Sequence, residues 1–216
     1  LSSKSNDYKS LKNDIDTDCL IVGAGIAGLT TAYLLSKENK KVVVVDADKV
    51  GYGASGRNTG KVTSQHGLIY DSIKKRYSSE KAKLYYEANE EGLDLIQNII
   101  KEYNINCNFK LVPSFIYTQE DEYVEQLKKE YETCKELNIP CEYYDKIKGI
   151  PLETKGALCF RNQGQFNPKK YVDALAKINI DMGVEIYENT PVVDVEVGKE
   201  CKVKCANGSI ITTKNL

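Results

Sequence analysis

The sequence predicts an α/β fold that begins with a parallel βαβ unit, and three observations lead to this prediction. The apolar run Asp18–Val22 ends abruptly in glycines, as expected of a buried strand. Helical spacing follows these glycines, with one face formed by Leu29, Ala32, Tyr33 and Ser36. A second strand, Lys41–Asp46, contains four consecutive valines, which suits a central parallel strand covered on both faces. Together the three segments form one βαβ unit of about thirty residues.

Further along the chain, helical and strand patterns alternate. Residues 51–65 are rich in Gly, Ser, Asn and Thr and predict a long loop. The elements expected after this loop are a helix over 79–103, a strand over 114–118, a helix over 121–137, a strand and turn over 156–166, a helix capped by Asn167, a strand at 184–187, an alternating strand at 193–197, and a closing hairpin that turns at Asn207-Gly208. A length of 216 residues suits one domain with a second, partial domain inserted into it.

Composition excludes several classes of protein. The 30 Lys and Arg residues nearly balance the 31 Asp and Glu residues, so no net field attracts nucleic acid or an anionic membrane. The apolar runs are far shorter than the ~20 residues that cross a bilayer, and the polar N-terminus lacks the apolar centre of a secretory signal. Seven cysteines without CxxC spacing indicate buried, reduced thiols, and hence a cytoplasmic location.

A glycine motif follows the first strand. The stretch GAGIAG at residues 23–28 matches GxGxxG, with a strand before it and a helix after it. The first glycine is expected to make the tight turn, the second to admit a pyrophosphate, and the third to let the helix meet the strand. Bare N–H groups at the start of the helix would point at the phosphates. This motif predicts a Rossmann-like dinucleotide-binding unit, with candidate contacts at Gly23, Gly25, Ile26, Ala27 and Gly28.

An acidic residue stands at the end of the second strand. Asp46 lies 18 residues beyond Gly28 and is expected, with its neighbour Ala47, to meet the ribose hydroxyls of an adenosine. Its negative charge argues against a 2′-phosphate, and hence against NADP. FAD and NAD both remain compatible with the βαβ unit at this point.

Two other kinds of site are excluded by spacing. Gly60-Lys61 lies in a glycine-rich loop, but a P-loop would need glycine where Ser55 stands and Ser or Thr where Val62 stands. His66 is the only histidine, so a histidine-based catalytic triad or a multi-histidine metal site cannot form within this chain. We therefore expect no metal site.

The loop after the second strand carries a more specific pattern. Gly53, Ser55, Asn58 and Gly60 match a G-x-S-x-x-N-x-G sequence. The segment thereby resembles the flavin loop of the D-amino-acid oxidase (DAO) superfamily, of the glycine oxidase and gamma-glutamylputrescine oxidase kind, which binds FAD through a glutathione-reductase-like fold. This resemblance implies that the loop runs past the pyrophosphate of FAD towards the isoalloxazine ring. The implied loop contacts are Ser55, Arg57, Asn58, Thr59, Gly60 and Lys61.

Other segments extend the resemblance. TSQHGLIY, at residues 63–70, is similar to a bacterial subgroup of these enzymes, some of which append a Rieske iron–sulfur domain, although no Rieske Cys/His pattern lies within this chain. FNPKKYVDALA and GVEIYENTPVVDVEV resemble the helix and strand pair that return to the FAD sheet, where Val192 would meet the adenine through its main chain. For His66 two interpretations remain: a hydrogen-bonding or covalent neighbour of the flavin, or a loop histidine bonded to the backbone.

The resemblance also implies a domain organisation and an activity. Residues 1–16 would be a polar lead-in, 17–78 with 167–216 an incomplete FAD-binding domain, and 79–166 a partial α+β substrate (cap) domain. The implied reaction is oxidation of the C–N bond of a small-molecule amine or amino acid. In this reaction the substrate carbon transfers a hydride to flavin. Because a full member continues further, we expect an N-terminal portion that needs its C-terminal half or a partner chain. No catalytic side chain is assigned.

Two alternatives remain open. The chain could be a non-catalytic module that binds FAD or ADP and serves as a structural subunit for a partner chain. It could also belong to another FAD enzyme on the same fold, such as a glycerol-phosphate dehydrogenase, a hydroxylase or an RNA-modifying enzyme. The near-neutral charge argues mildly against RNA as a substrate.

Overall fold

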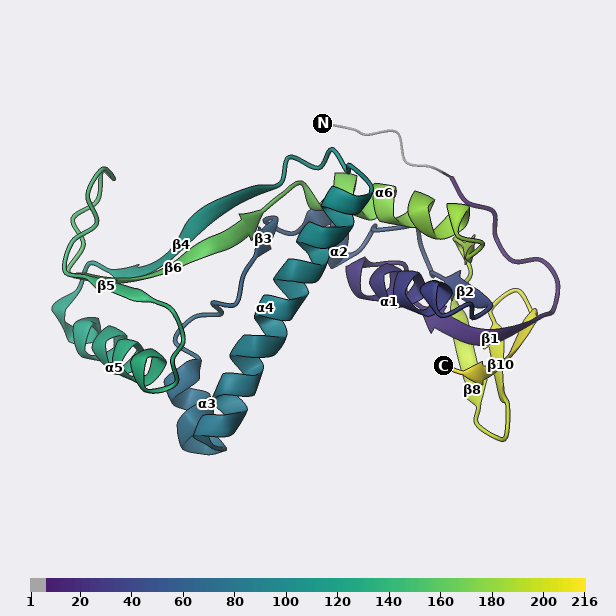
Figure 1. Cartoon of the computed structure of the whole chain (residues 1–216). Coiled ribbons are helices and arrows are strands. Elements are labelled where there is room, and N and C mark those ends of the chain that lie inside the picture. Colours follow the sequence, from purple (N-terminus) through teal and green to yellow (C-terminus); the bar gives the residue numbers. More distant parts are fainter. Residues whose placement is uncertain (1–6) are drawn as a thin grey trace. The chain divides into compact units, whose positions relative to one another are not determined.

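The computed structural model describes residues 7–216 and divides them into two compact units (Figure 1). The first unit contains the described residues up to Thr59, the short segment Ile105–Cys107, and Asn167–Leu216. The second contains Gly60–Asn104 and Asn108–Phe166. Residues 60–78, which we expected in the nucleotide-binding domain, thus cluster with the second unit. The naming of the units as FAD-binding and cap domains stays a prediction.

The first unit is built on a six-stranded sheet in the order β7-β2-β1-β10-β9-β8 (Figure 1). Its elements are β1 (Ile15–Val22), α1 (Ile26–Lys37), β2 (Val42–Val45), α2 (Ala54–Arg57), α6 (Pro168–Asp181), β7 (Glu185–Tyr187), β8 (Val192–Glu196), β9 (Cys201–Cys205) and β10 (Ile210–Asn215). Strands β7, β2, β1 and β10 are parallel, whereas β9 and β8 continue the sheet as an antiparallel meander. The expected βαβ unit and mixed α/β fold are confirmed.

The register of the parallel strands creates a common edge. Val22 pairs with Val45, and Val45 pairs with Tyr187, so β1, β2 and β7 end side by side. In open α/β sheets, ligands bind in the crevice outside such carboxyl ends. Helices α1 and α6 contact each other, and Asn167 caps α6 by accepting a hydrogen bond from the N–H of Lys170, as expected.

Within the described part of the expected lead-in, residues 7–16 are held by burial and hydrogen bonds. Strand β1 begins at Ile15, and Leu11 before it is buried in the same core as Leu20, Val43 and Val45. The N–H of Leu11 donates to Thr190 Oγ1 at 3.1 Å. A single buried leucine and its backbone partners thus anchor a segment whose composition is otherwise polar.

The second unit is a four-stranded antiparallel sheet packed against helices (Figure 1). Its elements are β3 (Lys61–Val62), α3 (Tyr70–Arg76), α4 (Ser79–Glu102), β4 (Lys110–Thr118), a 3-10 turn η1 (Asp121–Tyr123), α5 (Val124–Glu136), β5 (Glu142–Tyr144) and β6 (Gly156–Gln165). Strand β6 pairs with β3, β4 and β5. Its core includes Tyr70, Leu127, Cys134 and Phe160, which confirms Cys134 as a buried residue of an amphipathic helix.

Three features of the second unit differ from the sequence prediction. Helix α3 and the short strands β3 and β5 were not expected. The turn expected within 156–166 is instead a bulge in one continuous strand, where the pairing register shifts and Asn162 takes a positive φ of 57°.

In the first unit, the loop expected at 51–65 contains the four-residue helix α2, which contacts α6.

A carboxylate from a distant part of the sequence caps the start of helix α3. Glu130, on α5, is almost fully buried and accepts hydrogen bonds from the N–H groups of Tyr70 at 2.7 Å and Asp71 at 2.9 Å. Burial raises the pKa of Glu130, while these backbone hydrogen bonds act in the opposite direction. The bare amides at the start of α3 thus receive the acceptor that no residue of α3 itself supplies.

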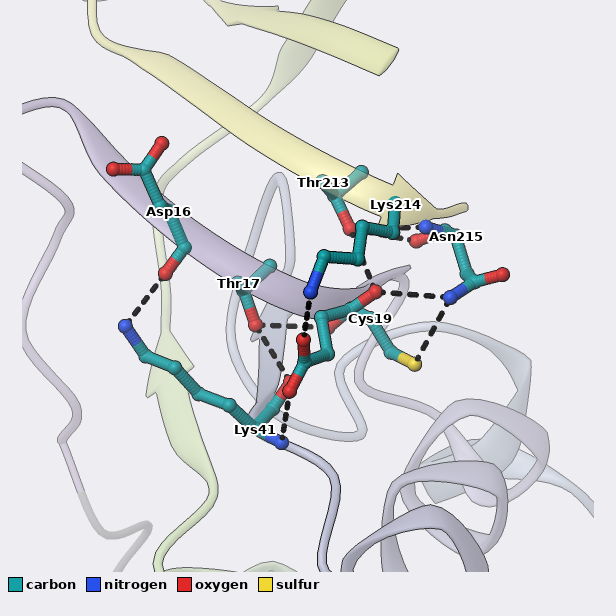
Figure 2. Close-up of polar contacts among 8 residues, drawn as sticks. Asp16, Thr17, Cys19, Lys41, Thr213, Lys214 and Asn215 are labelled. Carbon is teal, nitrogen blue, oxygen red and sulfur yellow. Dashed lines mark hydrogen bonds and ion pairs between the residues drawn. The ribbon is translucent and has the colours of Figure 1, made fainter. Parts of the chain in front are cut away.

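A polar cluster fastens β10 to β1 (Figure 2). Lys214 Nζ donates to Asp18 Oδ1 at 2.8 Å, and the backbone N–H of Lys41 donates to Asp18 Oδ2 at 3.1 Å. Thr17 Oγ1 donates to the carbonyl of Lys41 at 2.8 Å. The hydrogen bond from Lys214, with that from the Lys41 backbone, holds the pKa of Asp18 below its ordinary value of 3.8.

Replacing Lys214 should therefore destabilise the chain in a pH-dependent way. The contribution of Asp18 is fully present above pH 3.8 and is lost as the pH falls through its lower folded pKa. The contribution of Lys214, whose pKa is raised by Asp18, is present below pH 10.5 and is lost above its folded pKa. We expect the urea midpoint of Lys214→Met to fall below that of the wild type, with the largest difference between these limits.

Lys177→Met, at an exposed position of α6, is the control. An equal loss in this variant would contradict the role of the cluster.

A matched pair of glycines tests the packing of α1. A Cβ at Gly28 would lie 2.0 Å from the carbonyl oxygen of Gly23 and 3.1 Å from Ile21 Cγ2, whereas a Cβ at Gly92 in α4 would meet nothing within 4 Å. Gly28→Ala should lower the free energy of unfolding by more than about 2 kcal/mol, because backbone must move. Gly92→Ala should raise it by about 0.5 to 1 kcal/mol. Chemical denaturation followed by circular dichroism measures both; equal effects would refute the close approach.

Candidate dinucleotide-binding site

The turn from β1 into α1 has the backbone geometry that the glycine motif predicts. Gly23 takes a positive φ of 110°, and its N–H donates to the carbonyl of Val45 at 2.8 Å. Gly25 is the N-cap of α1, and no side chain caps the helix there. Within residues 7–216, no acceptor is recorded for the N–H groups of Ala27 and Gly28. The start of α1 therefore presents bare amide donors and the positive end of the helix dipole.

The serine of the following loop reaches this turn. Ser55 Oγ accepts a hydrogen bond from the N–H of Ile26 at 3.1 Å. A Cβ at Gly25 would lie 2.7 Å from the same oxygen, so only glycine leaves this approach open. Gly51 joins the contact by donating its N–H to the carbonyl of Ala24 at 3.0 Å. The structure thus brings the glycine motif and the loop serine together, as the sequence predicted.

The carboxylate of Asp46 is held in a fixed orientation beside the motif. Its Oδ2 accepts from the N–H of Ala24 at 2.7 Å, and its Oδ1 accepts from the N–H of Asp48 at 2.8 Å. Asp46 is half-buried and Ala47 is exposed. Each carboxylate oxygen keeps acceptor capacity after one hydrogen bond. The group can therefore accept further hydrogen bonds from hydroxyl groups without moving.

The segment before β8 is tied to the same residue. The N–H of Thr190 donates to the carbonyl of Asp46 at 2.8 Å, so the end of β2 and the approach to β8 lie together. Val192, two residues later, begins β8 and pairs with Cys205 of β9. Its expected main-chain contact with adenine stays a prediction.

The side chains of the remaining loop residues make different contacts. The Arg57 guanidinium lies over the ring of Tyr52, 4.1 Å from the centroid. The side-chain amide of Asn58 donates to the carbonyls of Ala54 at 3.2 Å and Ser55 at 2.9 Å, so it closes α2. Thr59 is exposed. The structure thus places these three candidates in the loop, and their contacts with a cofactor stay predictions.

The last two loop candidates belong to the second unit. Gly60 takes a positive φ of 72°, and Lys61 pairs with Gln165 in the β3–β6 ladder. Both residues belong to the second unit, whereas the glycine motif belongs to the first. Their predicted contacts with a cofactor remain untested.

The sequence analysis missed a second carboxylate at the same strand edge. Glu188 follows β7, is only 1% exposed, and accepts from the N–H groups of Val50 at 2.8 Å and Tyr8 at 3.1 Å. It stands directly after its strand, as Asp46 does after β2. That parallel position after a strand is the signal in the sequence that marks Glu188. Glu188 holds the loop that leads to α2 against the sheet.

His66 lies in the second unit with a side-chain partner. Its Nδ1 is 3.0 Å from the Tyr85 hydroxyl, and the two rings meet edge to face. Burial, together with the charge of Lys61, lowers the pKa of His66. The expected backbone partner of His66 is therefore wrong, because the hydrogen bond joins its ring to the side chain of Tyr85. A contact with flavin stays a prediction.

Two general features of the described part of the chain complete the description. Among residues 7–216, no group of three or more His, Cys, Asp or Glu side chains is arranged to hold a metal ion. The helices in the same range are all too short or too polar to cross a membrane.

The residues at the glycine turn fit the diphosphate and ribose of a dinucleotide. Bare amides suit an anionic diphosphate, Gly25 leaves the space that a Cβ would fill, and Asp46 offers a fixed acceptor for hydroxyls. These features do not distinguish a flavin from a nicotinamide cofactor. Comparison with known proteins makes that distinction.

The comparisons agree on one family. The model of a family described as DAO, FAD dependent oxidoreductase, matches residues 18–214. A putative Rieske 2Fe-2S iron-sulfur protein of Bacillus subtilis is 36% identical over 196 residues, which cover 91% of this chain and 38% of that protein. Gamma-glutamylputrescine oxidoreductase of Escherichia coli is 25% identical over 213 residues, covering 97% and 50%. This chain therefore spans half or less of the length of these relatives.

Solved structures show the same fold. The L-amino acid deaminase of Proteus myxofaciens superposes with a TM-score of 0.75 at 18% identity, covering 98% of this chain and 47% of that one. The glutathione-reductase-like type of fold and the cofactor FAD, both implied by the loop sequence, are confirmed, and FAD is preferred over NAD. With the family model matching nearly the whole sequence, the chain belongs to the DAO family of FAD-dependent oxidoreductases.

Proposed function

We propose that this chain provides the FAD-binding portion of an oxidoreductase that oxidises the C–N bond of a small amine or amino acid. The observation that carries the proposal is the pair of bare amides at Ala27 and Gly28, in the first turn of α1, with the fixed carboxylate of Asp46 held at the turn before it. The loop sequence that includes Ser55 supports the substrate class, as do relatives named for gamma-glutamylputrescine and L-amino acids. FAD, when bound, would supply the acceptor for a hydride from the substrate carbon.

The residues of this chain would bind and orient the cofactor. The amides of Ala27 and Gly28 would hold the diphosphate, and Asp46 would accept hydrogen bonds from the ribose. The main chain at Val192 would contact the adenine. The loop candidates Arg57, Asn58, Thr59, Gly60 and Lys61 would extend along the cofactor.

The organisation of the whole protein is part of the proposal. Residues 17–78 and 167–216 would form the FAD-binding domain, with 79–166 as part of a substrate cap. Because the chain spans half or less of its relatives, substrate contacts would come mainly from further sequence or from a partner chain. Seven free thiols suit a reducing compartment, so we propose a cytoplasmic location.

A double-mutant cycle tests the role of Gly25. Gly25→Ala should weaken FAD binding by about tenfold or more, because the new methyl group would occupy the space of the diphosphate. The methyl group would also contact Ser55 Oγ. If crowding against Ser55 were the whole cause, Gly25→Ala combined with Ser55→Ala would bind FAD as Ser55→Ala does. We expect no such rescue, measured by quenching of flavin fluorescence.

Control variants make the binding result specific. Gly92→Ala, in α4 of the second unit, should bind FAD like the wild type. Circular dichroism should show that Gly25→Ala keeps its secondary structure. Unchanged FAD binding by folded Gly25→Ala would contradict the proposed binding site.

The substrate class is tested with the full-length protein that contains this chain. Under anaerobic conditions, amines or amino acids should bleach the flavin absorbance, because hydride transfer reduces the cofactor. Glycerol 3-phosphate should leave the spectrum unchanged. Bleaching by glycerol 3-phosphate alone would favour the related dehydrogenases, one of which, from Caloramator mitchellensis, is 28% identical over 187 residues. The 216-residue chain should bind FAD and show little or no turnover.

Full-length protein that binds FAD but is reduced by neither substrate class would favour the alternative of a non-catalytic module. That outcome would refute the proposed activity while leaving the proposed cofactor site intact. The two parts of the proposal are therefore tested separately.

A further inference from the structure

Two cysteines of the second unit lie together although they belong to different elements. Cys134 is in the last turn of α5, and Cys141 immediately precedes β5. Cys134 is fully buried in the core of the unit, and Cys141 is half-buried and packs against the same core. The turn between them is closed by a hydrogen bond from the N–H of Ile139 to the carbonyl of Cys134 at 2.8 Å. The fold therefore brings both residues to the same core across a tight turn.

The two thiols differ in their access to solvent. Cys141 lines a cavity of about 410 Å³, and Cys159 and Arg161 of β6 line it as well. Cys134 is not among the residues that line this cavity. A small reagent that enters the cavity would thus reach Cys141 first, with Cys134 behind it in the core.

The pKa shifts of the two thiols follow the same order as their access to solvent. A hydrogen bond from the Cys134 thiol lowers the pKa of Cys141, although burial and the carboxylates of Glu130 and Glu142 oppose this effect. The same interaction, together with burial, raises the pKa of Cys134. Burial also raises the pKa of Cys159, the other thiol of the cavity. The direction of these shifts agrees with the geometry, in which Cys141 lines the cavity and Cys134 lies in the core.

We propose that Cys141 and Cys134 form a reversible disulfide when a hydroperoxide enters this cavity. The thiolate of Cys141 attacks the O–O bond, becomes a sulfenic acid, and releases hydroxide or an alcohol. The Cys134 sulfur then displaces the sulfenic oxygen as water, forming the S–S bond and giving up its proton. Two thiols lose two electrons and two protons in total, and the peroxide is reduced by the same two electrons.

The disulfide would join the end of α5 directly to the start of β5. Both elements contact each other already, so oxidation would fix an arrangement that the reduced chain holds by packing alone. The proposal concerns only the second unit, and it does not depend on FAD binding or on the oxidoreductase activity.

Peptide mapping after peroxide treatment tests the proposal on the 216-residue chain. Trypsin separates the three cysteines, because Lys135 lies between Cys134 and Cys141 and Lys155 precedes Cys159. After equimolar hydrogen peroxide, we expect a reducible cross-link between the peptides of Cys134 and Cys141, with Cys159 still free. Thiol loss should be about tenfold slower in Cys141→Ser, because the reacting thiolate is absent.

Three variants distinguish the proposed roles. In Cys134→Ala, Cys141 should stop at the sulfenic acid and be labelled by dimedone. Cys159→Ser is the matched control from the same cavity and should oxidise like the wild type. A cross-link from Cys141 to Cys159, or equal oxidation rates for Cys141 and the buried cysteines, would overturn the proposal. Circular dichroism of each variant before treatment shows that the fold is intact.

Discussion

The first unit depends on how closely the backbone of α1 approaches the turn before it. At Gly28 a single added carbon would lie 2.0 Å from the carbonyl oxygen of Gly23, and at Gly25 it would lie 2.7 Å from Ser55 Oγ. The helix can therefore start against the edge of the sheet only where side chains are missing. The same glycines that allow the packing also leave the amides uncovered.

Asp46 links this packing to the rest of the sheet. Its carboxylate accepts hydrogen bonds from the turn before α1 and from the backbone after β2, and its carbonyl accepts one from Thr190. A residue expected from sequence to bind only a ribose thus also joins three backbone segments. Changing it would disturb structure and binding together, so the cleaner evidence for a binding role comes from Gly25, whose replacement leaves these hydrogen bonds in place.

The sequence predicted the features that depend on neighbouring residues, and it missed those that depend on distant ones. The glycine turn, the α6 cap at Asn167 and the Asn207-Gly208 hairpin are set by local chemistry, and the structure confirms them. Helix α3 is capped by Glu130, some 60 positions away, and no local signal marks it. Glu188 is likewise defined by a partner far along the chain, Val50. Residues 60–78 cluster with the second unit, because membership of a unit is set by long-range packing.

Buried or half-buried carboxylates accept hydrogen bonds from backbone amides at three points in the described part of this chain. Glu130 caps α3, Glu188 accepts from the loop before α2, and Asp46 accepts from the turn before α1. The first turn of α1 itself contains no acidic residue, and in residues 7–216 no acceptor is recorded for its amides at Ala27 and Gly28. These two amides are therefore open to an anion from outside the described part of the chain. The diphosphate of FAD has the charge and the size for that position.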